Sequence, residues 1–171
     1  QGAFGRTPLH NAAKAGNPES IKTMLALYPE SERLKDVRDF NGWTVLHCAA
    51  QSGNPASIRL ILARYPETER LRVVTVRDSN ERNALHWVAW SGDPDCIKLI
   101  LSHYPESERL RAVSMPDNDE WTVLHCAAQS GKFESIETIL ALYPESERLQ
   151  ALNSKSQYGE TVLHLVADSN N

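Results

Sequence analysis

The sequence predicts an all-α solenoid, an elongated array of stacked helical units rather than a single closed core. One pattern, Thr-Val-Leu-His-Cys-Ala-Ala in its fullest form, recurs along the whole chain, and its histidine advances by 37 residues once and then by 39 residues three times. Between the copies lie one-sided apolar patterns of helical period and clusters of turn residues. A fixed period of this length is typical of units that bury their apolar faces only by stacking.

Each copy of this pattern predicts a short first helix. In the second copy Thr44 is a good N-cap, and Leu46, Ala49 and Ala50 follow at helical spacing. We expect the helix to end at Gly53, because glycine readily adopts a positive φ.

A second helix is expected directly afterwards. Asn54-Pro55 combines an N-cap with a proline at the first helical position, and Asn17-Pro18 and Asp93-Pro94 repeat the arrangement. Lys132-Phe133 departs from it, so that helix should begin less firmly. Apolar residues at i, i+3, i+4 and i+7 form a stripe that only a neighbouring repeat can bury, as at Ile58, Ile61, Leu62 and Tyr65.

A third, short helix is predicted by the motif Tyr-Pro-Glu-Ser-Glu-Arg-Leu, which begins at Tyr28, Tyr104 and Tyr143 and, in a near-copy, at Tyr65. The residue before a proline leaves the α region, and proline followed by acidic residues suits a new helix start. We expect the repeated charges to form a solvated face with i, i+3 pairs. The alternative is a charged surface that a partner recognises. Aspartate-led turns then predict finger loops at 39–42, 78–81 and 117–120.

These elements together resemble the ankyrin repeat. The resemblance rests on Leu46-His47, Ala49-Ala50, Gly53 and the segment Asp39-Phe-Asn-Gly42-Trp-Thr44, and it covers essentially the whole chain. The period of 39 residues exceeds the usual ~33, and the third-helix motif accounts for the addition. The resemblance implies one array over 1–171, with four full repeats at about 5–38, 39–77, 78–116 and 117–155 and a partial fifth at 156–171.

Composition and spacing argue against several function classes. Acidic and basic residues are mixed at a net charge of −4, so no basic stripe suits nucleic acid. No apolar run is long enough to span a membrane. Cys48 and Cys126 occupy one slot two repeats apart, beyond disulfide reach, and with Cys96 they are interpreted as small apolar residues in a reducing compartment. We expect a cytoplasmic protein, or the host-cell cytoplasm for a bacterial effector.

The motif histidines are interpreted as structural. They are the same in every copy, which the stack explains, and the resemblance implies a local hydrogen bond at each helix start. Metal ligation or general-base catalysis is the alternative. The sequence has no Gly-rich phosphate loop, GxSxG or HExxH pattern. We therefore predict no catalytic residues, no metal and no cofactor.

The resemblance implies that another protein contacts the finger tips and the exposed side of the first helices. Residues at these positions vary between copies, as a recognition surface would. The predicted partner-binding residues are Phe40, Asn41, Trp43, Gln51, Asn80, Arg82, Trp90, Asp119, Trp121, Gln129 and Tyr158.

The three tryptophans of this set are the expected anchors, because tryptophan and arginine often dominate protein interfaces. Repeat three is the most divergent copy, so Trp90 marks the expected centre of the surface. The alternative is that these rings pack against arginine or a neighbouring finger. Trp87 shares the slot of Cys48 and is expected to pack in the core.

These observations predict a monomeric protein–protein interaction module. The alternative is a spacer or oligomerisation array in a larger multidomain protein, such as a secreted bacterial effector, whose activity lies outside this segment. The start at Gln1 rather than Met leads us to expect a longer parent chain. We also expect the last apolar face, near Asn171, to be partly uncovered.

Overall fold

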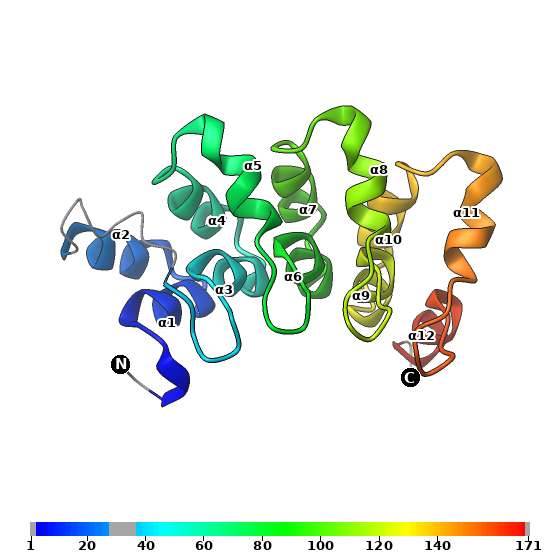
Figure 1. Ribbon diagram of the computed structural model, residues 1–171, viewed down its shortest axis with the longest axis horizontal. Coiled ribbons are helices and arrows are strands. Elements are labelled where there is room, and N and C mark those ends of the chain that lie inside the picture. The colour runs from blue at the N-terminus through cyan, green and yellow to red at the C-terminus, as the bar shows by residue number, and fades with distance from the viewer. Residues whose placement is uncertain (1–2, 28–36, 170–171) are drawn as a thin grey trace.

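The computed structural model describes residues 3–27 and 37–169. In these ranges the chain forms twelve α-helices and one short 3-10 helix at Ala3–Gly5, and no strand. The helices stack beside one another along the longest axis, with the two ends of the chain at opposite ends of the array (Figure 1). The predicted all-α solenoid is therefore confirmed.

The helices form three series. The first helices contact one another in order along the array and are α1 (Pro8–Lys14), α3 (Val45–Ser52), α6 (Ala84–Ser91), α9 (Val123–Gln129) and α12 (Val162–Ser169). The second helices form a parallel layer and are α2 (Pro18–Leu27), α4 (Pro55–Leu62), α7 (Pro94–Leu101) and α10 (Phe133–Leu140). The third helices are α5 (Glu67–Thr75), α8 (Glu106–Ser114) and α11 (Glu145–Leu152). The third helix predicted from the motif at Tyr28 falls outside the described residues.

Each first helix begins with a capping box between its N-cap and the motif histidine. At α3 the Thr44 backbone N–H lies 3.0 Å from His47 Nδ1, and the Thr44 hydroxyl oxygen accepts from the His47 backbone N–H. Because a backbone N–H can only donate, Nδ1 accepts and the ring proton lies on Nε2. His47 Nε2 donates to the carbonyl of Val76, 3.0 Å away, at the base of the next finger. The expected local role of the histidines is confirmed, and the second bond ties one repeat to the next loop.

The second helices begin as predicted. Asn54 accepts from the backbone N–H groups of Ala56 and Ser57, and Asp93 accepts from that of Cys96. Lys132 provides no side-chain cap for α10, as its departure from the pattern predicted.

The third helices correct one expectation. The arginine of the repeated motif does not serve mainly as an i, i+3 ion-pair partner. Arg70, Arg109 and Arg148 donate from Nε to the carbonyls of the preceding Tyr65, Tyr104 and Tyr143, at 3.2, 3.4 and 3.2 Å. Each of these carbonyls lies in the turn after the second helix, three residues beyond its last residue, and accepts a charge-assisted hydrogen bond there. The arginine thus joins this turn to the third helix.

The core runs through the array between these layers. The apolar stripes of the second helices are buried, for example Ile97 and Ile100 at 0% exposure. Cys48, Cys96 and Cys126 are free, buried thiols, and burial raises the pKa of each to about 12. They serve as small apolar side chains, as predicted.

Candidate protein-binding surface

The first three fingers between repeats are organised by a buried aspartate at the start of the turn, and the fourth begins with the buried Ser156. Asp39 Oδ1 accepts from the backbone N–H groups of Asn41 and Trp43, at 2.9 Å each. Asp78 and Asp117 make the same pair of bonds in the next two fingers. The fourth position of the turn adopts a positive φ, whether it is Gly42 (φ 74) or Glu120 (φ 61). The fingers are therefore defined turns rather than irregular loops.

Backbone hydrogen bonds link each finger to the next. Ser79 N donates to Asn41 O at 3.0 Å, Asn118 N to Asn80 O at 3.1 Å, and Gln157 N to Asp119 O at 3.0 Å. Three of the predicted binding residues, Asn41, Asn80 and Asp119, thus use their carbonyls to hold the row of fingers together. This pre-organises the row, so binding there would cost little ordering entropy.

In the first four repeats, the residue just before the N-cap of the first helix alternates between cation and indole, as Arg6, Trp43, Arg82 and Trp121. The fifth position is Glu160. Arg6 Nε donates to Asp39 Oδ2 at 2.9 Å, and its guanidinium lies 5.3 Å from the centre of the Trp43 ring. Burial by itself would raise the pKa of Asp39, but the Arg6 hydrogen bond and the turn N–H groups lower it overall.

Arg82, two repeats further along, likewise binds the aspartate of the following finger. It donates to Asp117 and, through Nη2, to Asp119 at 3.3 Å, and its guanidinium lies 5.6 Å from both the Trp87 and Trp90 rings. Burial opposes the charged form, yet the Asp117 hydrogen bond and charge raise the pKa of Arg82 overall. Arg82, with 13% of its side chain exposed, is committed to the array and offers little to a partner.

The four tryptophans form one continuous row. The ring centres are 4.2 Å apart for Trp43 and Trp87, 6.3 Å for Trp87 and Trp90, and 5.7 Å for Trp90 and Trp121, the last pair being stacked at 25°. Trp87 also donates from Nε1 to Asp78 Oδ2 at 3.0 Å. Its expected position in the core is confirmed by an exposure of 6%.

Trp43 requires a correction. It was expected to present an exposed ring beside the finger, but it is only 7% exposed. The ring lies between Arg6 and Trp87, where it packs as part of the array. The alternative of packing against arginine is the one that the structure supports for this residue.

The other predicted binding residues fall into two groups. The half-buried side chains are Gln51, Arg82, Trp90, Asp119 and Trp121. The exposed ones are Phe40, Asn41, Asn80, Gln129 and Tyr158. The structure brings Trp90 and Trp121 into contact, whereas Phe40 and Tyr158, 77% and 69% exposed, come from the first and last fingers.

Two residues of this surface were not singled out from the sequence, Arg6 and the Asp117 carboxylate that holds Arg82. The alternation of arginine and tryptophan in one slot was the available signal. Arg6 and Trp43, in equivalent positions of neighbouring repeats, lie close enough for a cation–π contact.

The buried histidines are poorly suited to proton transfer. Burial lowers the pKa of His47 and of His86 to about 4, so both rings are neutral near pH 7. Over residues 3–27 and 37–169, no group of three or more histidine, cysteine or acidic side chains is arranged to hold a metal ion. In the same ranges, no helix has the length and apolar character required to cross a membrane.

Comparison with known proteins agrees with this architecture. Residues 1–71 and 69–148 match a family described as ankyrin repeats (3 copies). No curated protein matches the chain. Ankyrin repeats generally act as protein–protein interaction modules. The two matched segments together span most of the 171 residues, so the chain belongs to the ankyrin repeat family.

Proposed function

We propose that this array binds a partner protein through the stacked Trp90–Trp121 pair and the finger tips on either side of it. The observation that carries the proposal is that both rings are half-buried: each is held by its neighbours yet retains accessible aromatic surface. Rigid aromatic side chains of this kind contribute large contact areas with little loss of rotamer entropy on binding.

The surroundings of the pair suit the rim of an interface. Asn80 on one finger and Gln129 on α9 are exposed polar side chains, and the bonds between fingers keep the backbone in place. An apolar centre with a polar, partly solvated rim is the usual anatomy of a protein interface. Trp43 is not part of the proposed contact surface, because its ring is buried.

The test uses Trp90→Gln, since glutamine occupies the equivalent slot in repeats two and four as Gln51 and Gln129. The fold therefore accommodates the change. Wild-type and variant arrays would be used to capture partners from lysate, followed by affinity measurement on the captured protein. We expect Trp90→Gln to weaken binding by more than about 1 kcal/mol. The variant should also lose about 1–2 kcal/mol of folding free energy, because the ring contacts Trp87 and Trp121, and it should remain folded in the binding assay.

The proposal fails if Trp90→Gln lowers the unfolding midpoint and leaves capture and affinity intact, because Trp90 would then be scaffold. Gln129→Ala provides a matched control in the same slot of the next repeat. It removes an exposed polar side chain and is expected to change affinity by much less than Trp90→Gln.

A spacer or self-association role is the second candidate. It is favoured by exposed leucines near the end of the array, Leu149 on α11 at 68% and Leu163 on α12 at 46%. Exposed apolar surface of this kind promotes association between copies. Sedimentation at several protein concentrations distinguishes the two, since the binding-module proposal expects a monomer throughout. With the binding-module function we also propose a location in the cytoplasm, or in the host-cell cytoplasm for a bacterial effector.

A further inference from the structure

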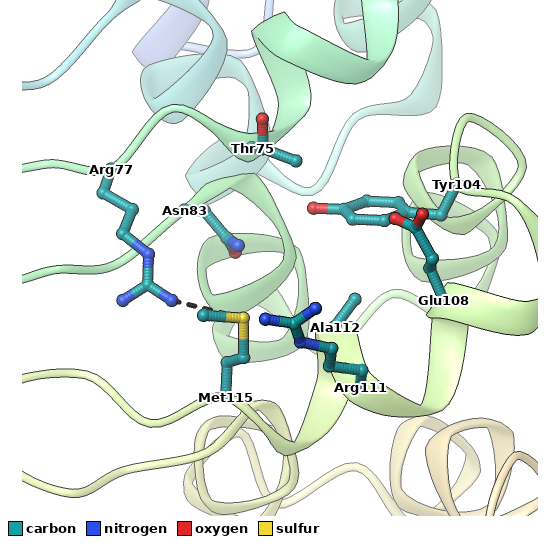
Figure 2. A pocket seen from close by; sticks show the side chains of 8 residues that line it. All are labelled: Thr75, Arg77, Asn83, Tyr104, Glu108, Arg111, Ala112 and Met115. Atoms are coloured by element: carbon teal, nitrogen blue, oxygen red, sulfur yellow. Dashed lines mark hydrogen bonds between the residues drawn. The ribbon is translucent and has the colours of Figure 1, made fainter.

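A pocket of about 160 Å³ lies between α5, the start of α6 and α8. Its walls come from two neighbouring repeats: Thr75 ends α5, Asn83 is the N-cap of α6, and Arg111 and Met115 lie on and just after α8. Figure 2 shows the Tyr104 hydroxyl and the Arg111 guanidinium pointing into the same space. The tryptophan row is not part of this lining.

The Tyr104 hydroxyl is a buried polar group without a partner. Tyr104 is 6% exposed, and its oxygen makes no hydrogen bond in the structure. The equivalent residue of the next repeat differs, because the Tyr143 hydroxyl lies 3.0 Å from Ser114 Oγ. A buried hydroxyl that loses its contact with water costs free energy unless another group satisfies it. The unsatisfied group here points into the pocket.

Two further donors converge on this space. Asn83 uses its Oδ1 to accept from the backbone of Leu85 and His86, which leaves its amide NH₂ as the free end facing the pocket (Figure 2). Arg111 forms no hydrogen bond or ion pair with any residue that the structure describes. Arg77, opposite, is held by Glu81 at 3.2 Å and lies beside the Met115 sulfur. Donors therefore outnumber acceptors around the cavity.

From this set we propose that the pocket binds a single carboxylate group. The planar guanidinium of Arg111 can donate two parallel hydrogen bonds to the two oxygens of a carboxylate. The Tyr104 hydroxyl and the Asn83 amide supply neutral donors to the same oxygens. The exposed Glu108 on the same wall repels any anion, and it repels a doubly charged phosphate about twice as strongly as a singly charged carboxylate, so it favours the carboxylate of the two.

The next repeat supplies an internal comparison. Its corresponding pocket contains Thr122 in place of Asn83 and Gln150 in place of Arg111, and its tyrosine hydroxyl is already paired. Repeat two has Tyr65 and Arg72 in the slots of Tyr104 and Arg111, so Asn83, which replaces Thr44 and Thr122, is the binding group that distinguishes repeat three from both neighbours. Because no residue of the tryptophan row lines the site, the inference is independent of the proposed protein-binding surface.

The experiment is a nuclear magnetic resonance titration of isotope-labelled protein with sodium acetate at constant ionic strength. We expect saturable shifts of the Asn83 side-chain amide and of the Ala112 backbone amide, with no matching shift at the equivalent Ala151. Arg111→Gln, which copies Gln150, should weaken acetate binding about tenfold. Tyr104→Phe should weaken it about threefold without lowering the unfolding midpoint, because the hydroxyl has no partner to lose.

Tyr143→Phe is the matched control and should leave acetate binding unchanged. Absence of saturation overturns the proposal, as does an affinity that is the same in Arg111→Gln. Inorganic phosphate provides a second arm, and tighter binding of phosphate than of acetate would refute the carboxylate assignment. The carboxylate could come from the C-terminus of a chain or from an acidic side chain, and two short peptides distinguish these sources. The first has a free C-terminus and no acidic side chain. The second is amidated at its C-terminus and contains one glutamate. Binding of either peptide supports the proposal, and binding of neither, with acetate also inactive, overturns it.

Discussion

Replacing Trp43 by alanine tests whether this tryptophan belongs to the scaffold. Its ring is 7% exposed, its centre lies 4.2 Å from that of Trp87, and the Arg6 guanidinium lies 5.3 Å above it. Truncating a buried tryptophan to alanine costs about 3–5 kcal/mol of folding free energy. The aromatic pair with Trp87 accounts for about 0.5–1.5 kcal/mol of that loss.

Trp121 gives a matched comparison, because it occupies the same slot two repeats later. It is half-buried, and its principal ring contact is the stacked Trp90. Since only part of its surface is removed from water, we expect Trp121→Ala to cost about 1–2 kcal/mol. The difference between the two variants follows from burial alone, as the residue type and the slot are the same.

The assay is urea unfolding followed by circular dichroism. Stacked arrays can lose cooperativity between repeats, so amide hydrogen exchange in α1 and α3 should accompany it. The slowly exchanging backbone amides of α3 should exchange faster in Trp43→Ala and should keep their protection from exchange in Trp121→Ala. The reasoning is refuted if Trp43→Ala costs no more than Trp121→Ala, because Trp43 would then be available for recognition after all.

Two other predictions concern stability. Burial lowers the pKa of His47 and His86 from an ordinary 6.5 to about 4, so the unfolded chain binds more protons between these values and stability falls as the pH drops through this window. Each histidine should cost about 2 kcal/mol at pH 5 relative to neutral pH; equal urea midpoints at pH 7.5 and pH 5 would contradict this. Glu120 occupies the left-handed region at φ 61, where Gly42 stands in an earlier finger, so Glu120→Gly should stabilise the array by about 0.5–1 kcal/mol in the same assay. A lower midpoint for this variant would show that the side chain makes a contact outweighing the strain.

Local features of the fold could be predicted because their causes lie within a few residues. The capping box of Thr44 and His47, the uncapped start at Lys132 and the three helices per repeat follow from short-range patterns. The role of Arg109 could not be predicted in this way. Its charge suited a solvated ion pair, whereas the free carbonyl of Tyr104 attracts it only once the chain has turned between two helices.

The candidate binding surface was predicted less completely than the fold. Sequence comparison between repeats identified the slots that vary, and Trp90 and Trp121 do retain exposed surface. It could not separate Trp43 from Trp121, because identical residues in one slot differ only in what the neighbouring repeat places against them. Arg6 and Trp87 enclose the ring of Trp43, whereas the ring of Trp121 stacks on Trp90 and stays partly exposed.

The sequence by itself determined the period, the helix starts and the register of this array, since repeated motifs report their own local conformation. The second helices end at Leu62, Leu101 and Leu140, three residues before the tyrosine that closes the predicted apolar stripe. The tertiary structure decided which copy of each slot is buried, partnered or free. Tyr104 and Tyr143 show the reason: both tyrosines begin the same motif, yet only one hydroxyl finds a serine in the adjoining repeat. Each slot is completed by side chains of the adjoining repeat, 29 residues away for Tyr143 and Ser114 and 35 for Arg82 and Asp117, and only the stacked fold brings those side chains together.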